Sequence, residues 1–286
     1  MQQQDMAGVT LVVGLGKSGL ATARALRALG VAFAVTDSRA EPPGLAALRT
    51  ESPAAPQYLG GFDPAAFAGA ARLLVSPGIA VKTPVIAEAA ARGVPVWGDI
   101  ELLARLTPVP IAAITGSNGK STVTTLLGLM TERAGVRAAV GGNLGTPALE
   151  LWLRDEWNVD AAPELYVLEL SSFQLETTHS LNARVATVLN ISPDHMDRYD
   201  TLDDYVAAKR RIFRGDGVMV VNADDPVVMA MLEPGRNALR FTLDEPDAND
   251  FGLRQEGGET WLAHGRERWI GAAELHISGD HNLANA

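Results

Sequence analysis

The stretch that decides the fold of this chain reads Thr115-Gly116-Ser117-Asn118-Gly119-Lys120-Ser121-Thr122. It follows an apolar run from Val109 to Ile114, which predicts a buried strand, and it precedes a helical pattern from Ser121 to Ala134. Glycines let successive backbone N–H groups point at one anion, and the helix N-terminus adds partial positive charge. Lys120 can reach the β and γ phosphates, and Ser121 or Thr122 can hold Mg²⁺ through a hydroxyl. The stretch therefore predicts a nucleoside triphosphate site.

This loop departs from the standard phosphate-loop pattern at one position. The pattern has a glycine five residues before the Gly-Lys pair, where this chain has Ile114, so the loop is the shorter Gly-x-x-Gly-Lys-Ser. Gly-rich turns between a strand and a helix also occur without any ligand. The Gly-Lys-Ser-Thr run favours the phosphate-binding interpretation.

Composition limits the classes of protein to which the chain can belong. Its 286 residues suffice for two domains of ordinary size, and 47% of them are hydrophobic. We find no apolar run of about twenty residues and no signal peptide, so we expect a cytoplasmic protein without membrane insertion. The chain has no cysteine, which excludes disulfides. The net charge of −10 argues against non-specific nucleic-acid binding, which needs Lys and Arg to neutralise phosphates.

The N-terminal region predicts a βαβ unit at the start of a doubly wound sheet. The apolar residues 9 to 13 lead into Gly14-x-Gly16-x-x-Gly19, a helical pattern follows up to Gly30, and a second strand ends at Asp37. The glycine spacing with Asp37 fits a dinucleotide fingerprint and, by itself, suggests NAD. The same turn serves any ligand with a pyrophosphate, and Arg39 could pair with a phosphate in bidentate fashion.

A domain boundary is predicted near the two prolines at 108 and 110, because proline disfavours a continuing helix or strand interior. We therefore expect domains at 1–108 and 109–286. Further strands are predicted at 73–75 and 95–97 in the first domain. In the second they are predicted at 136–140, 165–170, 185–190 and 218–222. Helices are predicted at 84–92 and 203–213.

Polar residues follow several of these strands, where ligands of open α/β sheets bind. Asn143 lies among the glycines of 141–145, and His195 lies in the polar run 190–198. Glu169 is the one carboxylate in an otherwise apolar strand. Its burial would be costly without a partner, which favours a role as a Mg²⁺ ligand over a pairing with an arginine. His195 could ligate a second metal or contact a phosphate.

The chain resembles the Mur ligases, the ATP-dependent amino-acid ligases of peptidoglycan precursor synthesis, and within them the D-glutamate-adding members. The short phosphate loop is the form found in that family. The motifs that carry the resemblance span almost the whole chain, in order. They are Gly14-Leu15-Gly16-x-Ser18-Gly19, Ser76-Pro77-Gly78-Ile79, Gly98-Asp99-Ile100-Glu101, the loop at 114–125, Gly141-Gly142-Asn143-Leu144-Gly145, Leu168-Glu169-Leu170-Ser171-Ser172-Phe173-Gln174-Leu175-Glu176, Asp194-His195-Met196-Asp197-Arg198-Tyr199 and His281-Asn282-x-x-Asn285-Ala286.

The resemblance implies an α/β fold with an N-terminal Rossmann-like domain that binds a UDP substrate and a central P-loop ATPase-like domain. A third, Rossmann-like domain would begin beyond Ala286. Because a helix entered at 279–286 would be cut after one turn, we expect the chain to be a truncation that binds substrate without being active alone. We expect a monomer, and the family implies a place in cell-wall synthesis and hence in cell shape and division.

The resemblance also implies the roles of individual residues. Catalysis falls to Lys120, Glu169, His195 and Lys209, and the metal ligands are Ser121, Glu169, His195 and, if it is carbamylated, Lys209. The ATP-binding residues would be Gly116, Ser117, Asn118, Gly119, Lys120, Ser121, Thr122, Asn282 and Asn285. The UDP-substrate residues would be Leu15, Gly16, Lys17, Ser18, Asp37, Ser38, Arg39, Gly78, Asn143, Ser171, Gln174 and His195. Lys17 stands where some relatives have a hydroxyl residue.

The implied reaction uses ATP and Mg²⁺ to join D-glutamate to UDP-N-acetylmuramoyl-L-alanine through an acyl phosphate. One alternative is another Mur-type or folylpolyglutamate ligase, which the Ser-Ser-Phe-Gln run disfavours. An NAD-dependent oxidoreductase would leave the Lys120 loop unexplained. A nucleotide-sensing binding module without catalysis is a third alternative.

Overall fold

The structure is a computed structural model that describes residues 6–156, 162–277 and 279–286. It divides into two compact units, and each is described by itself. The first unit comprises Met1–Val109, Gly141–Pro163 and Ser172–Leu181, and the second comprises Pro110–Val140, Glu164–Ser171 and Asn182–Ala286. The predicted domains were 1–108 and 109–286. In the structure, the segments Gly141–Pro163 and Ser172–Leu181 belong to the first unit instead. They do so because their helices pack on helices of that unit.

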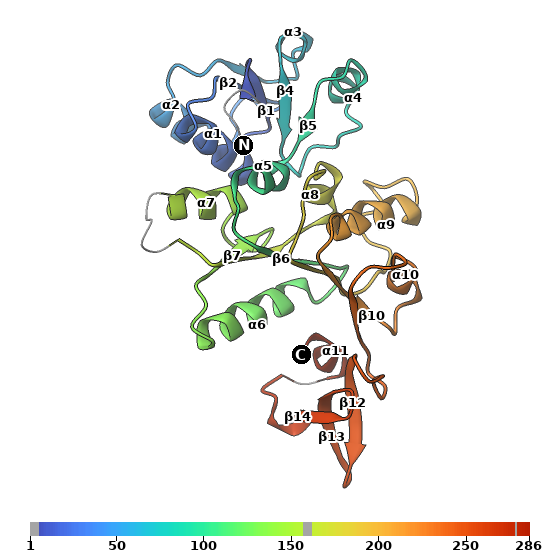
Figure 1. Cartoon of the computed structure of the whole chain (residues 1–286). Helices are drawn as coiled ribbons and strands as arrows, with labels where there is room; N and C mark the ends of the chain where they lie inside the picture. Colours follow the sequence, from blue (N-terminus) through green and yellow to red (C-terminus); the bar gives the residue numbers. More distant parts are fainter. Residues whose placement is uncertain (1–5, 157–161, 278) are drawn as a thin grey trace. The chain divides into compact units, whose positions relative to one another are not determined.

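The first unit is built on a five-stranded parallel sheet with the order β3-β2-β1-β4-β5. Its strands are β1 (Thr10–Val13), β2 (Phe33–Asp37), β3 (Gln57–Leu59), β4 (Arg72–Val75) and β5 (Val96–Trp97). Its helices are α1 (Lys17–Ala28), α2 (Leu45–Glu51), α3 (Pro64–Ala68), α4 (Pro84–Ala91), α5 (Asp99–Leu106), α7 (Ala148–Glu156) and α8 (Ser172–Glu176). Figure 1 shows α1 and α2 on one side of this sheet and α3 and α4 on the other. The predicted doubly wound sheet is confirmed.

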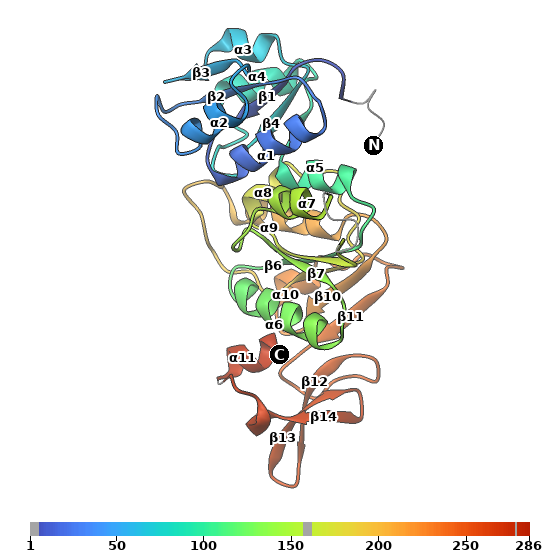
Figure 2. The same cartoon turned by 90° about the vertical axis from the view of Figure 1, so that its left-hand side faces the viewer.

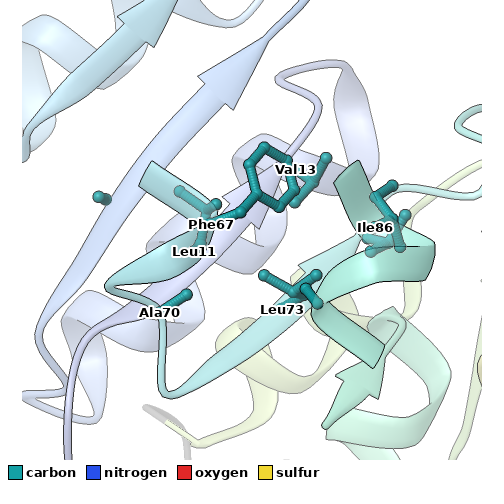
Figure 3. Close-up of a cluster of buried hydrophobic side chains, with 9 residues drawn as sticks. Leu11, Val13, Phe67, Ala70, Leu73 and Ile86 are labelled. Carbon is teal, nitrogen blue, oxygen red and sulfur yellow. The ribbon is translucent and has the colours of Figure 1, made fainter. Parts of the chain in front are cut away.

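The core of the first unit explains this arrangement. Because strand side chains alternate between faces, Leu11 and Val13 of β1 point to the same side. There they pack with Phe67 of α3 and Ile86 of α4 (Figure 3). All four side chains are at most 2% exposed. Burying an apolar side chain of this size contributes about 1.5–3 kcal/mol. This core therefore fixes the ends of β1 and β4, from which the loops of the first site emerge.

The second unit is built on a nine-stranded sheet with the order β14-β13-β12-β11-β10-β9-β6-β8-β7. Its strands are β6 (Ile111–Thr115), β7 (Ala138–Gly142), β8 (Leu165–Glu169), β9 (Val185–Val188), β10 (Val218–Asn222), β11 (Ala238–Phe241), β12 (Phe251–Glu256), β13 (Glu259–His264) and β14 (Glu267–Gly271). Its helices are α6 (Lys120–Arg133), α9 (Leu202–Arg210), α10 (Pro226–Met229) and α11 (Asp280–Asn285), with 3₁₀ turns at Arg211–Phe213 and Ala272–Glu274. In Figures 1 and 2, α6 and α9 lie on opposite faces of the central strands.

The central strands of the second unit run parallel, so their carboxyl ends share one edge. Parallel pairing joins β6 to β8 and β9, and continues from β9 through β10 and β11 to β12. The register pairs Ile114 of β6 with Glu169 of β8 and Thr115 with Val188 of β9. The loop after β6 therefore begins beside Glu169 and beside the polar run that follows β9. The antiparallel strands β12 to β14 were not among the sequence predictions.

Candidate nucleotide and phosphate sites

A cavity of about 580 Å³ opens at the carboxyl ends of the first unit's strands. It is lined by the glycine-rich loop before α1, the end of β2, the loop after β4, and two segments from later in the chain. The lining residues are Gly14, Gly16, Lys17, Ser18, Asp37, Ser38, Arg39, Ser76, Pro77, Gly78, Ile79, Gly142, Asn143, Gly145, Pro147 and Gln174. Ligands of doubly wound sheets bind at this edge.

Asp37 carries the fixed negative charge of this cavity. One of its carboxylate oxygens accepts the N–H of Leu15 at 2.7 Å, and the carboxylate also binds the Arg39 guanidinium at 2.8 and 2.9 Å. Burial by itself would raise the pKa of Asp37, but the hydrogen bonds from Arg39 and Leu15 outweigh burial and lower the pKa to about 2. Asp37 is therefore ionised at neutral pH, and half-exposed Arg39 keeps one face toward solvent.

The structure brings together nine of the twelve residues predicted to bind the UDP substrate. Leu15 is fully buried and contributes its backbone N–H to Asp37 rather than a side chain to the cavity wall. Ser171 and His195 belong to the second unit. The nine in the cavity wall are Gly16, Lys17, Ser18, Asp37, Ser38, Arg39, Gly78, Asn143 and Gln174.

The phosphate loop of the second unit joins β6 to α6, as predicted. Gly119 is the N-cap of α6 and has a φ of +81°, a left-handed conformation that glycine adopts without strain. The Lys120 ammonium donates to the carbonyl oxygens of Gly116 and Ser117 at 2.9 and 2.8 Å. Burial lowers the pKa of Lys120, while the charges of Glu169 and Asp194 oppose that change. The lysine is thus held inside the curve of the loop, and half-buried Thr122 follows in the first turn.

Ser121 and Glu169 meet beside this loop. The Ser121 hydroxyl donates to Glu169 Oε2 at 2.7 Å, and Glu169 is only 2% exposed. A buried carboxylate next to a hydroxyl at a helix N-terminus is a donor set that suits Mg²⁺, which takes few protein ligands and completes its shell with water and phosphate oxygens. Within the described ranges, no three His, Cys, Asp or Glu side chains form a metal-binding group. The residues present therefore fit a metal shared with phosphates rather than one held by protein alone.

Lys209 donates to the same loop. It is 2% exposed, and its ammonium donates to the Gly116 carbonyl at 2.8 Å and to the Thr115 hydroxyl at 3.3 Å. The ring of Tyr205 lies 4.7 Å from the ammonium, in cation–π contact. Burial and, after it, the charge of Lys120 lower the pKa of Lys209 to about 7, although the nearby carboxylates oppose that change. A lysine in this setting is partly neutral at physiological pH.

Asn190 and Tyr205, which sequence reasoning did not single out, hold the loop in place. Asn118 and Asn190 form a reciprocal pair, in which the Asn118 N–H donates to Asn190 Oδ1 at 2.8 Å and the Asn190 amide donates to the Asn118 carbonyl at 3.1 Å. The Ser117 hydroxyl lies 3.0 Å from the Tyr205 hydroxyl and accepts the N–H of Ser192 at 2.9 Å. The polar run after the strand was a signal for Asn190, whereas nothing local marks Tyr205.

The remaining predicted residues are Asn282, Asn285 and His195. The Asn285 side chain approaches so closely that a Cβ on Gly119 would meet its Oδ1 at 2.5 Å, and its amide donates to Asn282 at 3.4 Å. His195 has a φ of +56°, is half-exposed, and lies 3.4 Å from Asp194. The roles of these residues toward a nucleotide or metal remain predictions.

Two protein-family models match this chain. The Mur ligase middle domain matches residues 114–286, and the N-terminal domain of the MurD-like Mur ligases matches residues 8–98. The first match alone covers more than half of the chain, so the chain belongs to the Mur ligase family.

Curated relatives agree with the family assignment. The chain is 55% identical to a UDP-N-acetylmuramoylalanine–D-glutamate ligase of Nitrosococcus oceani and 54% identical to one of Methylococcus capsulatus. Each comparison covers 99% of this chain but only 61% and 60% of the relative. The chain therefore spans about three fifths of the length of these relatives.

Solved structures share the fold. The UDP-N-acetylmuramate:L-alanyl-γ-D-glutamyl-meso-diaminopimelate ligase from Neisseria meningitidis superposes with a TM-score of 0.61, covering 97% of this chain and 90% of that chain at 18% identity. The UDP-N-acetylmuramate–alanine ligase of Thermotoga maritima gives 0.55, with 97% and 63% covered at 17% identity. Within the described residues, no helix is long and apolar enough to cross a membrane.

Proposed function

We propose that this protein takes part in the ATP-dependent joining of D-glutamate to UDP-N-acetylmuramoyl-L-alanine, a step of peptidoglycan precursor synthesis. The observation that carries the proposal is the constellation around the phosphate loop, where Lys120, Lys209 and the Ser121–Glu169 pair surround one turn of backbone. It occurs in a chain that is 55% identical to a D-glutamate ligase. The need for ATP favours the cytoplasm as the compartment.

The residues suit the attack of a carboxylate on a triphosphate. Two anions repel each other, so the site must neutralise charge and hold the reacting oxygens in line. Lys120 would bind the β and γ phosphates, and the loop N–H groups at the N-terminus of α6 would donate to phosphate oxygens. Ser121 and Glu169 would hold Mg²⁺, which supplies charge neutralisation when it is bound. Attack of the substrate carboxylate on the γ-phosphate would form an acyl phosphate and release ADP. The amine of D-glutamate would then attack the acyl carbon, with release of phosphate and a proton.

Lys209 suits a second role, as a carbamylated metal ligand. A carbamate forms only from the neutral amine, and a pKa of about 7 leaves an appreciable neutral fraction at physiological pH. Carbamylation would convert the amine that donates to the Gly116 carbonyl into an anion, at a position where the charge of Glu169 already acts on that amine. We propose this modification together with His195 as a further metal ligand.

The cavity of the first unit suits the UDP end of the substrate. Ionised Asp37 accepts hydrogen bonds, which fits a ribose hydroxyl or a uracil N–H, and Arg39 fits a phosphate. The family assignment favours this ligand over NAD, which the glycine spacing alone had suggested. ATP, in turn, would occupy the loop at 116–122 and approach Asn282 and Asn285.

Calorimetric titration of the 286-residue chain tests the proposal. We expect UDP-N-acetylmuramoyl-L-alanine to bind and NADH not to bind, and we expect ATP with Mg²⁺ to bind at a separate site. Binding of NADH in place of the UDP substrate, or competition between ATP and the UDP substrate for one site, would contradict the proposal.

A further inference from the structure

The polar run after β9 contains one peptide group that is held from both sides. Asn190 and Ile191 share this group, and the described residues contain no cis peptide bond. In a trans peptide the C=O and the N–H point in opposite directions. The carbonyl of Asn190 accepts the N–H of Ser117 at 3.0 Å, and the N–H of Ile191 donates to Asp225 Oδ2 at 2.7 Å. This peptide group therefore connects the phosphate loop to Asp225, the residue before α10 (Figure 1).

Asp225 is the N-cap of α10 as well as the acceptor for Ile191. Its Oδ1 accepts the N–H groups of Val227 at 2.9 Å and Val228 at 3.1 Å. Backbone N–H groups can only donate, so both carboxylate oxygens serve as acceptors. An N-cap needs one acceptor oxygen, which a serine or an asparagine also supplies. The second oxygen, bound to Ile191, thus exceeds what the helix requires.

Ser117 carries this restraint into the phosphate loop. Its N–H binds the shared peptide group, and its own carbonyl accepts the Lys120 ammonium at 2.8 Å. Rotation of the Asn190–Ile191 peptide would break the bonds to Ser117 and to Asp225 together. A carboxylate that binds the N–H of a peptide also polarises its carbonyl, which strengthens the bond on the other side. The position of Lys120 therefore depends on Asp225 through one peptide group and one loop residue.

The chain offers a natural comparison at a second Asp-Pro cap. Asp63 precedes Pro64 and caps α3, just as Asp225 precedes Pro226 and caps α10. The Asp63 side chain is exposed and accepts the N–H of Ala65 at 2.9 Å. In the part of the chain that the structure describes, it accepts from its own helix alone. The bond to a distant peptide therefore separates Asp225 from an ordinary cap.

We propose that Asp225 is a positioning residue of the nucleotide site, which holds the Asn190–Ile191 peptide so that the phosphate loop presents Lys120 to the phosphates of a nucleoside triphosphate. The role toward the nucleotide rests on the proposed function. The connection from Asp225 to Ser117 rests on the contacts alone.

Asp225→Asn tests the proposal while keeping the cap. The single carbonyl oxygen of an asparagine is held by the two N–H groups of α10, so its NH₂ group faces the N–H of Ile191 and two donors meet. We expect ATP with Mg²⁺ to bind about tenfold more weakly, because the peptide turns and Ser117 loses its acceptor. The affinity for UDP-N-acetylmuramoyl-L-alanine should stay within about twofold of wild type. Calorimetry on the 286-residue chain measures both affinities.

Asp63→Asn is the matched control, because it makes the same exchange at a cap without a distant partner. We expect both affinities of this variant to stay within about twofold of wild type. Asp225→Ser, which supplies a cap but no second oxygen, should lose ATP affinity as Asp225→Asn does. Wild-type ATP affinity in either Asp225 variant would overturn the proposal. So would an equal loss for both ligands, since that pattern belongs to general destabilisation.

Failure of the wild-type chain to bind ATP would contradict the proposed function and not the connection through the peptide. The backbone amide NMR signals of Ser117 and Ile191 test that connection without ligand. We expect Asp225→Asn to shift both signals and Asp63→Asn to leave them in place. An unchanged Ser117 signal in Asp225→Asn would overturn the inference whatever the ligand is.

Discussion

Two loops of this molecule share one design and differ in charge. The loop at 14–19 of the first unit and the loop at 116–120 of the second each join the carboxyl end of a buried strand to a helix. In each loop, one backbone N–H donates a hydrogen bond to a side chain that lies at the end of another strand. In the first loop the Leu15 N–H binds the carboxylate of Asp37, and in the second the Asn118 N–H binds the neutral amide of Asn190.

The groups that surround the loops follow the same division. Half-buried Lys120 directs its ammonium group, and buried Lys209 its partly neutral amine, at carbonyl oxygens of the second loop. The first loop has the exposed Lys17 and the ionised Asp37. A fixed carboxylate repels a phosphate placed against it, whereas an ammonium group shielded from water attracts one. A glycine-rich turn thus provides room for a ligand, and side chains from neighbouring strands decide which part of a ligand it can hold.

The largest expected effect comes from removing the charge inside the second loop. Lys120→Ala should weaken ATP binding by on the order of a hundredfold or more, because a fixed donor to the phosphates is lost from a partly buried site. Binding of the UDP substrate should be unchanged, which calorimetry with each ligand would measure. A comparable loss for both ligands would mean that the two loops do not serve separate ligands.

The lowered pKa of Lys209 should make the free energy of unfolding depend on pH. Its pKa is about 7 in the folded chain and near the ordinary 10.5 when unfolded. Between these values the unfolded chain binds a proton that the folded chain lacks, so stability should rise with pH across this window. The contribution of this residue should change by about 2 kcal/mol between pH 7 and pH 9.

The measurement is the free energy of unfolding in urea, in buffer free of CO₂, for wild type and Lys209→Met at both pH values. From pH 7 to pH 9, the free energy of unfolding of wild type should increase by about 2 kcal/mol relative to that of Lys209→Met. A difference that is the same at both pH values would show that Lys209 keeps its ordinary pKa. The second loop would then have a fully charged lysine at this position.

The first loop should respond most to a change in backbone packing. A Cβ on Gly19 would overlap the carbonyl oxygen of Gly14, whereas a Cβ on Gly16 would meet nothing within 4 Å. Gly19→Ala should lower the free energy of unfolding by about 1–2 kcal/mol, since overpacking outweighs the gain in helix propensity. Gly16→Ala is the matched control and should leave stability nearly unchanged while narrowing the ligand site. Equal effects on urea unfolding would contradict the close-packing role of Gly19.

Local sequence patterns were enough to predict both loops and the strands beside them. The apolar run at 218–222 coincides with β10, and the runs before each glycine-rich turn coincide within two residues with β1 and β6. The strands β12 to β14 escaped prediction because their half-buried, mixed sequence has no continuous apolar run. The helix α5 escaped because its first turn contains two buried carboxylates, which local patterning assigns to solvent.

Tertiary contacts set the parts of the site that the sequence left open. Lys209 reaches Thr115 across 94 positions, and Ser117 reaches Tyr205 across 88. These contacts join residues that are far apart in the sequence, and no periodic pattern indicates them. Spacing alone therefore could not distinguish Lys209 from its basic neighbours. The resemblance to the Mur ligases selected it. The structure adds the reason that its amine is unusual, namely burial beside a second lysine.

The smallest effect is expected from removing the exposed positive charge of Lys17 beside the first loop. Lys17 is exposed at the first position of α1 and lines the cavity, so its attraction for a ligand phosphate acts through solvent. Exposed charge pairs contribute about 0.2–1 kcal/mol, so Lys17→Ala should weaken binding of the UDP substrate by about two- to fivefold. Because salt screens exposed charges over about 10 Å at roughly 0.1 M, the difference should vanish in about 0.5 M salt.

Calorimetry at both salt concentrations measures this difference in affinity, with Lys17→Gln as the control of similar size. A loss that persists in high salt would mean that Lys17 closes onto its phosphate in the bound state, and the first loop would then resemble the second more than its charges suggest.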